Sequence, residues 1–207
     1  MISILIPTYN YNTLPLVEEL CRQTLSESIE FEIIVADDAS PINENTEINS
    51  KINQLSNCQF IRNEVNLGRG QNRNALVQKA KYDWVLLMDC DTFPKDKNFI
   101  SNYIESIKNR VEKVIFGGII YYNEKPKDDE MLRWIFGKSR EDIPLSKRLA
   151  NPFHYTLISN ILIQKDILLK HPFDSEIYNY GYEDIVFILG LKREQIAIAH
   201  IENSAFH

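Results

Sequence analysis

The chain has 207 residues, a length that suits a single domain. Hydrophobic residues make up 44% of it and charged residues 25%, proportions that exclude a disordered segment and are typical of a globular protein. The net charge is −6 and no basic stripe is present, which argues against nucleic acid as the main partner.

The same composition limits where the protein works. No apolar run approaches the roughly 20 residues that span a bilayer, so we expect no transmembrane segment. The first residues, MISILIPTYN, lack the basic start of a signal peptide and are typical of a strand. The scattered cysteines Cys21, Cys58 and Cys90 predict reduced thiols and no zinc cluster. We therefore expect a cytoplasmic protein, compatible with peripheral contact at the inner face of the membrane.

The first half of the chain alternates apolar strands with helices. Strands are predicted at residues 2–6, 31–36, 58–61 and 84–88, and helices at residues 13–24, 42–55 and 68–80. Thr13 stands at the N-cap position of the first helix, with Pro15 in its first turn. Strands that alternate with helices of this length predict βαβ units and a parallel sheet buried on both faces.

The second half is less regular. Helices are predicted at residues 99–108 and 183–191, and strands at residues 114–116, 157–163 and 196–199. Residues 122–152 are charged and interrupted by prolines, so a long loop with short helices is expected there.

Polar residues follow the ends of three predicted strands. These segments are Pro7-Thr8-Tyr9-Asn10, Asp37-Asp38 and Asp89-Cys90-Asp91. Ligands of open parallel sheets bind at the carboxyl ends of the strands. If the strands are neighbours, their polar ends meet in one crevice.

Asp89 and Asp91 are the most suggestive pair. In an extended segment they would face one side and Cys90 the other. Two close carboxylates repel unless a proton or a cation neutralises them. Mg²⁺ is commonly held by one or two carboxylates together with substrate phosphates. The ordinary alternative is a strand that leaves the core through a polar loop.

The other polar segments also have two interpretations. Asp37-Asp38 either caps a turn or accepts hydrogen bonds from a base or a ribose. Arg69 and Arg73 open a helix on one face, which is either solvated or turned toward an anion.

The late acidic and histidine residues leave similar alternatives. Glu183-Asp184 either stabilises the start of a helix through its interaction with the helix dipole or supplies a general base. A lone histidine is usually a packed or surface residue, but either His200 or His207 can complete the coordination of a metal.

Taken in order, the motifs resemble the inverting family 2 glycosyltransferases with a GT-A fold. The matching segments are residues 4–10, 35–40, 66–68 with 73–74, 87–91 and 182–184. The resemblance covers nearly the whole chain, although residues 120–155 match no part of the family pattern. It implies an α/β, Rossmann-like fold in which helices flank an open, mixed and mostly parallel sheet. It also implies one domain over residues 1–207, with a nucleotide-binding half (1–95), an acceptor-binding half (96–207) and a truncated C-terminus.

The resemblance implies a role for each matching position. The implied nucleotide pocket consists of Pro7, Thr8, Tyr9, Asp37, Asp38, Gly68, Arg73 and Asp89. The implied ligands of a Mg²⁺ or Mn²⁺ ion are Asp91, Asp89 and His207, with His200 as a competitor for the histidine. Asp184 is the implied catalytic base, with Glu183 beside it near the acceptor.

The implied reaction moves a sugar from a nucleotide-diphosphate sugar, with UDP as the expected nucleotide, to a hydroxyl of a glycan or lipid-linked acceptor. Inversion needs a single displacement and no covalent enzyme intermediate. Surface polysaccharide or glycan synthesis is the expected setting. A non-catalytic nucleotide-sugar-binding or partner-binding domain is the alternative, and it predicts that Asp184→Asn has no effect.

Two other enzyme classes share single features with this sequence. A haloacid dehalogenase-type phosphatase also places Asp-x-Asp after an apolar strand, but near the N-terminus and with Thr or Val where this chain has Phe93. A nucleotidyltransferase usually begins with a glycine-rich basic loop, and residues 7–10 are not one.

Overall fold

The computed structural model of the protein describes residues 1–177 and 181–207. Its strands are β1 (Ile2–Thr8), β2 (Phe31–Asp37), β3 (Cys58–Arg62), β4 (Trp84–Met88), β5 (Phe93–Pro94), β6 (Val114–Phe116), β7 (Ile119–Ile120), β8 (Asn160–Gln164), β9 (Ala199–His200) and β10 (Ala205–Phe206). Its helices are α1 (Leu14–Ser26), α2 (Glu44–Ser50), the 3₁₀ helix η1 (Lys51–Gln54), α3 (Arg69–Lys79), α4 (Phe99–Asn109), α5 (Met131–Arg140), α6 (Leu145–Ala150), α7 (Pro152–Tyr155), α8 (Lys165–Lys170) and α9 (Glu183–Arg193).

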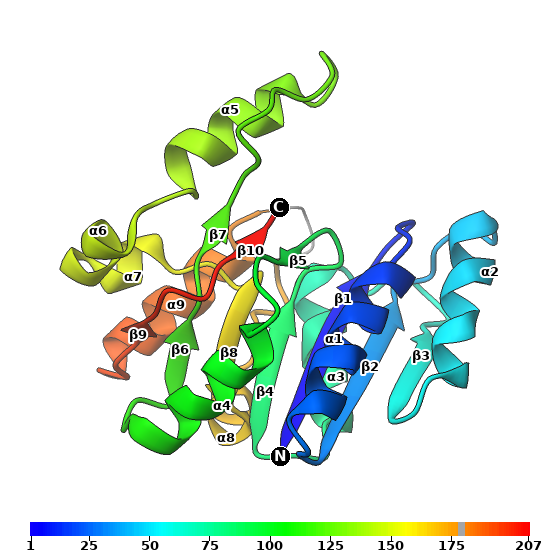
Figure 1. The fold of residues 1–207 in the computed structure, drawn as a ribbon, viewed down its shortest axis with the longest axis horizontal. Helices are drawn as coiled ribbons and strands as arrows, with labels where there is room; N and C mark the ends of the chain where they lie inside the picture. The colour runs from blue at the N-terminus through cyan, green and yellow to red at the C-terminus, as the bar shows by residue number, and fades with distance from the viewer. Residues whose placement is uncertain (178–180) are drawn as a thin grey trace.

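The central sheet has seven strands in the order β3-β2-β1-β4-β8-β6-β9 (Figure 1). β1 pairs in parallel with both β2 and β4, and β2 pairs in parallel with β3. β8 runs antiparallel to both of its neighbours, β4 and β6. The expected neighbourhood of the three polar strand ends is therefore confirmed, because β1, β2 and β4 are adjacent and end on the same edge.

A second, three-stranded sheet carries the end of the chain. β10 lies between β5, with which it is antiparallel, and β7, with which it is parallel. The backbone N–H of Lys95 donates to the carbonyl of Ser204 at 3.1 Å, and the N–H of His207 donates to that of Ile120 at 3.0 Å. These bonds fix the last residues beside the loop that follows β4.

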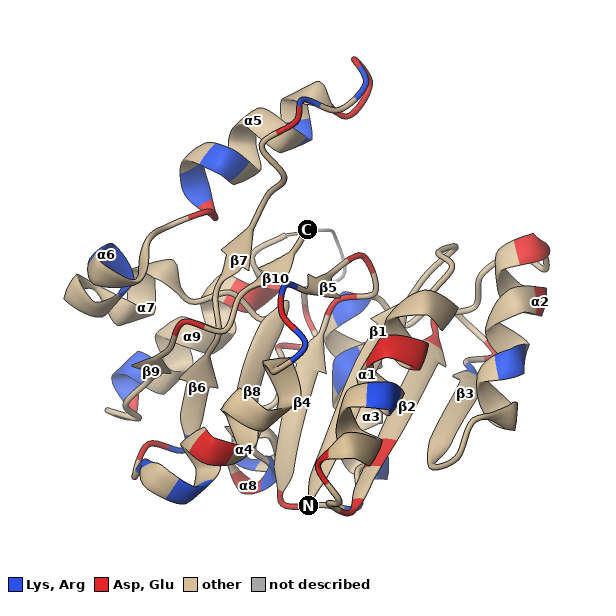
Figure 2. Cartoon of the chain, viewed as in Figure 1, with Lys and Arg blue, Asp and Glu red and all other residues tan. Residues whose placement is uncertain are grey.

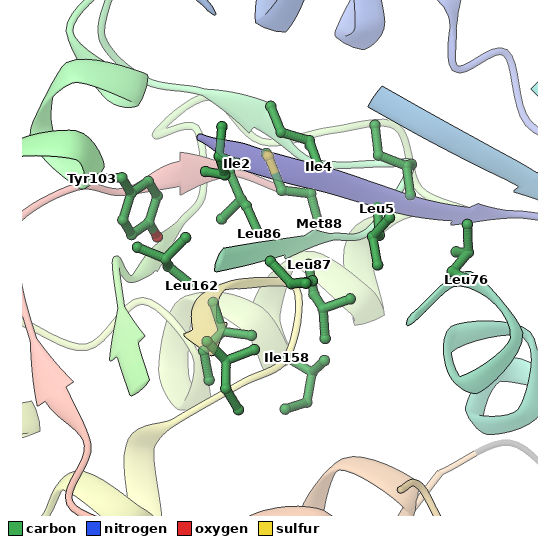
Figure 3. Close-up of a cluster of buried hydrophobic side chains, with 14 of the residues drawn as sticks. Ile2, Ile4, Leu5, Leu76, Leu86, Leu87, Met88, Tyr103, Ile158 and Leu162 are labelled. Carbon is green, nitrogen blue, oxygen red and sulfur yellow. The ribbon is translucent and has the colours of Figure 1, made fainter. Parts of the chain in front are cut away.

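The core forms where helices cover both faces of the sheet. α1 and α4 lie on one face, and α3 and α8 on the other (Figure 1). Leu86 and Leu87 of β4 are almost fully buried and point to opposite faces, as alternation along a strand requires. Figure 3 shows them among the other side chains of this cluster.

The expected strands and helices are present, but the bounds of several differ, and the short elements β5, β7, β10 and α8 were not predicted. The helix expected at residues 42–55 begins at Glu44, because Asn43 caps it by accepting from the N–H of Thr46 at 3.2 Å, and it tightens into η1. The strand expected at residues 196–199 is only Ala199–His200. The proline-interrupted region does contain short helices, α5, α6 and α7.

Charged residues lie mostly outside the centre of the seven-stranded sheet. β4, β6 and β8 contain no charged residue, and Figure 2 shows them in tan, while the helices carry most Lys and Arg. Among the described residues, no helix combines the length and apolar character needed to cross a membrane.

Candidate active site

Two adjoining cavities open at the carboxyl ends of β1, β2 and β4. The first is lined by Pro7, Thr8, Tyr9, Tyr11, Asp38, Arg69, Asn72, Asp89, Cys90 and Asp91. The second is lined by Arg69, Asp89, Asp91, Arg133, Phe136, Glu141, Leu157, Ser159, Gly181, Tyr182, Glu183, Asp184, Ile185 and His207. Arg69, Asp89 and Asp91 belong to both sets and therefore form the wall between the cavities.

The end of β1 shapes one side of the first cavity. Thr13 does stand at the N-cap position of α1, but its hydroxyl does not cap the helix and donates to Oγ1 of Thr8 at 3.0 Å. This bond holds the buried Thr8 at the cavity wall. Tyr9 is 53% exposed, so its ring is available to a ligand.

Asp38 organises the loop that leads into α3. Its Oδ1 accepts from the N–H of Leu67 and its Oδ2 from the N–H of Gly68, both at 2.9 Å. Gly68 has φ of 80°, a conformation that favours glycine. Asp38 thus lines the first cavity and also sets the backbone from which Arg69 projects.

Asp37 is not in either cavity. It is 2% exposed, its Oδ2 accepts from Nε of Arg62 at 2.9 Å, and its Oδ1 accepts from the hydroxyl of Ser40. Arg62 is its neighbour in the register of β2 with β3. The turn-capping interpretation therefore fits Asp37, and only Asp38 is presented to the cavity.

The segment after β4 turns instead of remaining extended. The N–H of Thr92 donates to the carbonyl of Asp89 at 3.1 Å, and its hydroxyl donates to the same oxygen at 2.7 Å. The expectation of two carboxylates side by side with Cys90 facing away is therefore wrong. Asp89 faces α3, Asp91 faces the end of the chain, and Cys90 lies in the wall of the first cavity, where burial raises the pKa of its thiol to about 12.

Arg73 is the centre of a buried ion cluster. It is fully buried, and its guanidinium donates to Asp89 Oδ1 at 2.7 Å and to Asp184 Oδ1 at 2.9 Å. Its Nη1 also lies 3.6 Å from Glu183 Oε1. The nucleotide contact that the resemblance implies for Arg73 is not seen in the structure, because the buried guanidinium is turned to these carboxylates.

Arg69 is the better placed of the two arginines for an external anion. Its Nη2 donates to Asp89 Oδ2 at 2.9 Å and its Nε lies 3.3 Å from Glu183 Oε1, yet 40% of its side chain is exposed. It lines both cavities. The sequence indicated a role for at least one of the pair, and only the structure distinguishes them.

Asp184 and Glu183 begin α9 but have different surroundings. Glu183 is 6% exposed at its side chain and its Oε2 accepts from the N–H of Gly181 at 3.1 Å, so it braces the start of the helix. Asp184 keeps 27% of its side chain exposed. Burial raises the pKa of Asp184, and the repulsion of Asp89 and Glu183 adds to this against the opposing charge of Arg73.

The end of the chain supplies a histidine to the second cavity. Nε2 of His207 lies 3.3 Å from Oδ2 of Asp91. Burial alone would raise the pKa of Asp91, but the hydrogen bond and charge of His207 outweigh it, so the pKa lies below its ordinary value. These two residues are more than 100 positions apart, and β10 brings them together.

His200, the competing histidine, lies elsewhere. It is 3% exposed on β9, with Nε2 3.1 Å from Thr156 Oγ1 and 3.2 Å from the carbonyl of Pro152. Burial lowers its pKa to about 4. It lines neither cavity and is therefore not placed to bind a metal together with Asp91.

Asp91 and His207 fit a divalent cation in part. Their oxygen and nitrogen converge at 3.3 Å, and a carboxylate with an imidazole is a donor set that such ions accept. Among residues 1–177 and 181–207, no group of three or more His, Cys, Asp or Glu side chains forms a cation site. Asp89 is engaged by Arg69 and Arg73 and does not join the pair. A cation here would need further ligands from a diphosphate or water.

The cavities also contain residues to which the sequence assigned no role. Arg133, Phe136 and Glu141 reach the second cavity from α5 and the loop after it. They lie between residues 120 and 155, where no family motif was recognised in the sequence, so no sequence signal identified them.

Comparisons with solved structures define the fold. S. aureus TarS 1–349 in complex with UDP matches with a TM-score of 0.70 and 20% identity, over 100% of this chain and 60% of that one. The mannosyltransferase PcManGT from Pyrobaculum calidifontis, in complex with GDP-Man and Mn²⁺, matches with a TM-score of 0.67 and 13% identity, over 100% and 56%. The fold is thus of the GT-A type, a mixed and mostly parallel sheet flanked by helices.

The family follows from the sequence itself. The family described as "Glycosyl transferase family 2" matches residues 3–171, so the chain belongs to glycosyltransferase family 2. Chondroitin synthase of Pasteurella multocida (strain Pm70) is 26% identical over 90% of this chain, and chondroitin synthase of Escherichia coli 25% identical over 100%. The chain spans only 22% and 34% of the length of these two relatives.

Proposed function

We propose that this domain transfers a sugar, with inversion, from a nucleotide-diphosphate sugar to a hydroxyl acceptor. One observation carries the proposal: the two cavities share the wall of Arg69, Asp89 and Asp91, and Asp184 stands in the second cavity. A diphosphate at that wall would have its nucleoside in the first cavity and its sugar in the second, within reach of Asp184.

The proposed donor contacts follow from the first cavity. Pro7, Thr8, Tyr9 and Asp38 would receive the base and ribose, Asp89 would face the ribose side, and Arg69 would meet the diphosphate. Residues 1–95 would then be the nucleotide-binding half and residues 96–207 the acceptor-binding half. A UDP-linked donor is supported by the fold shared with TarS, whose structure holds UDP.

In the proposed chemistry, Asp184 accepts the proton of the acceptor hydroxyl as its oxygen attacks the anomeric carbon. Arg73 holds this carboxylate in place through its 2.9 Å bond. Asp91 and His207 would hold Mg²⁺ or Mn²⁺, which supplies neutralisation of the charge on the leaving nucleoside diphosphate. The acceptor would be a glycan or a lipid-linked sugar in cell-surface polysaccharide synthesis at the cytoplasmic side. The likeness to two chondroitin synthases supports the polysaccharide setting.

The proposal is tested by incubating the protein with UDP-, GDP- and dTDP-sugars and Mn²⁺ or Mg²⁺, and measuring nucleotide release. We expect release with at least one donor, at a higher rate when an acceptor glycan is added. If calorimetry detects donor binding but no donor is consumed with any acceptor, the domain is a non-catalytic binder.

Asp91→Asn is expected to lower turnover by about 100-fold or more, because several kcal/mol of charge stabilisation depend on the cation. The variant should also require a higher Mn²⁺ concentration for half-maximal rate. Asp83→Asn is the matched control, since Asp83 is exposed at the opposite end of β4. Equal metal dependence in the two variants would contradict the assignment of Asp91.

The raised pKa of Asp184 predicts the shape of the pH–rate profile. A general base works when deprotonated, so kcat/KM should fall as the pH drops through a pKa above the ordinary value of about 3.9. Because this pKa is higher in the folded than in the unfolded chain, the free energy of unfolding should decrease as the pH rises through that range. The measurement is kcat/KM against pH, and an acidic limb at or below the ordinary value would be inconsistent with the base.

A further inference from the structure

A chain of three side chains, Tyr121, Glu141 and Arg133, contacts the imidazole of His207 at Nδ1. Tyr121 is 5% exposed, and its hydroxyl lies 3.0 Å from Nδ1 of His207. The same hydroxyl donates to Oε2 of Glu141, which also accepts from Arg133 Nη2 at 2.9 Å. All of these contacts lie on the side of the ring away from Asp91.

The number of hydrogens on these side chains decides which nitrogen carries the hydrogen when His207 is neutral. A tyrosine hydroxyl has one hydrogen, and an ionised carboxylate only accepts. Since Tyr121 gives its hydrogen to Glu141, its oxygen faces His207 as an acceptor. Nδ1 must then carry a hydrogen, so a neutral ring has its lone pair on Nε2. Arg133 also approaches Nδ1, but at the longer distance of 3.4 Å.

The consequence appears at the other ring nitrogen. When the ring is neutral with its hydrogen on Nδ1, Nε2 and Asp91 Oδ2 are two acceptors 3.3 Å apart that point at each other. Such a pair is unfavourable by itself and favourable around a cation. Histidine ligands generally have their tautomer fixed by a hydrogen bond to the second nitrogen.

Packing and hydrogen bonds from α5 fix the position of Tyr121. Its ring packs on Gly137 of α5, where an added Cβ would lie 2.0 Å from the Tyr121 Cζ atom. Lys138 of the same helix donates to the Tyr121 carbonyl at 2.8 Å and to Asp142 at 2.9 Å. α5 therefore holds Tyr121 and Glu141 against His207.

We propose that Tyr121 and Glu141 are positioning residues that hold His207 as its Nδ1–H tautomer, so that Nε2 faces Asp91 as a cation ligand. The inference rests on the proposed cation site of Asp91 and His207. It gives residues 121–142, where no family motif was recognised in the sequence, a role in preparing that site.

The test compares Tyr121→Phe, Glu141→Leu and Tyr122→Phe with the unaltered chain. The readouts are the ¹⁵N spectrum of neutral His207 without metal and the affinity for Mn²⁺ in the presence of UDP. Tyr121→Phe should lose the tautomer preference and bind Mn²⁺ about 10-fold more weakly, as outer-shell changes commonly do. Glu141→Leu frees the hydroxyl hydrogen of Tyr121 to donate to Nδ1 and should shift the population toward Nε2–H.

Tyr122→Phe is the matched control. Tyr122 is 58% exposed and stacks on Phe206, and the substitution keeps this ring contact, so it should behave as the unaltered chain. An Nε2–H tautomer in the unaltered chain, or unchanged tautomer and Mn²⁺ affinity in Tyr121→Phe, would overturn the inference alone. Failure of the unaltered chain to bind Mn²⁺ with UDP would overturn the cation site, and the inference with it.

Discussion

Asp184→Asn is expected to reduce the rate of sugar transfer by about 10²- to 10⁴-fold, the usual contribution of a positioned general base. Asparagine has nearly the same shape and its oxygen can still accept from Arg73 Nη1, which now lies 2.9 Å away. The amide cannot take the acceptor proton. The loss should therefore fall on kcat, while donor affinity measured by calorimetry stays near that of the unaltered chain.

The fold of this variant should be preserved for an electrostatic reason. Two arginines, Arg69 and Arg73, face three carboxylates in the cluster, and the substitution removes one negative charge whose pKa burial has raised. Asp166→Asn is the matched control, because Asp166 is 69% exposed at its side chain and lies outside both cavities. Full transfer activity in Asp184→Asn would exclude the base and favour a non-catalytic binding domain.

Arg73→Met is expected to destabilise the fold by about 3–5 kcal/mol, the usual effect of removing one partner from a buried ion cluster. Arg73 is fully buried and touches Asp89 and Asp184 with its two terminal nitrogens, at 2.7 and 2.9 Å. Burial alone would lower the pKa of Arg73, but the carboxylates outweigh it and the pKa is raised. Without the guanidinium, the carboxylates are left buried and poorly compensated.

The measurement is the free energy of unfolding from urea titration. Arg69→Met makes the same chemical change one helical turn earlier, and it should cost only about 1 kcal/mol, because 40% of the Arg69 side chain is exposed and exposed pairs contribute little. Arg73→Lys should fall between the two, since lysine keeps the charge but cannot donate to two carboxylates in a planar fork. Equal stability of Arg73→Met and Arg69→Met would contradict the structural role of Arg73.

Most of the fold was readable in the sequence because its signals are local. The alternation of apolar strands with helices comes from side-chain periods of two and 3.6 residues within short segments. The polar ends of β1, β2 and β4 were equally local, and the parallel rule placed them on one edge. The same residues carried the resemblance to family 2, which the family match over residues 3–171 confirms.

The site depended on contacts that no local pattern encodes. Asp37 and Asp38 are indistinguishable as neighbours in sequence, yet Arg62 of the adjacent strand takes the first and leaves the second to the cavity. Arg73 and Asp184 are 111 positions apart and meet only because α3 and α9 pack behind the sheet.

By itself, then, the sequence determined the α/β architecture and the edge of the sheet that carries the site, because strand period and strand ends are properties of short segments. Only the tertiary structure decided that His207 and not His200 meets Asp91, since β10 inserts between β5 and β7 while β9 is buried beside β6. It also decided that Arg73 is buried, and that Tyr121 and Glu141 lie on the Nδ1 side of His207. These choices depend on which surfaces pack together, and residues far apart in the chain decide that.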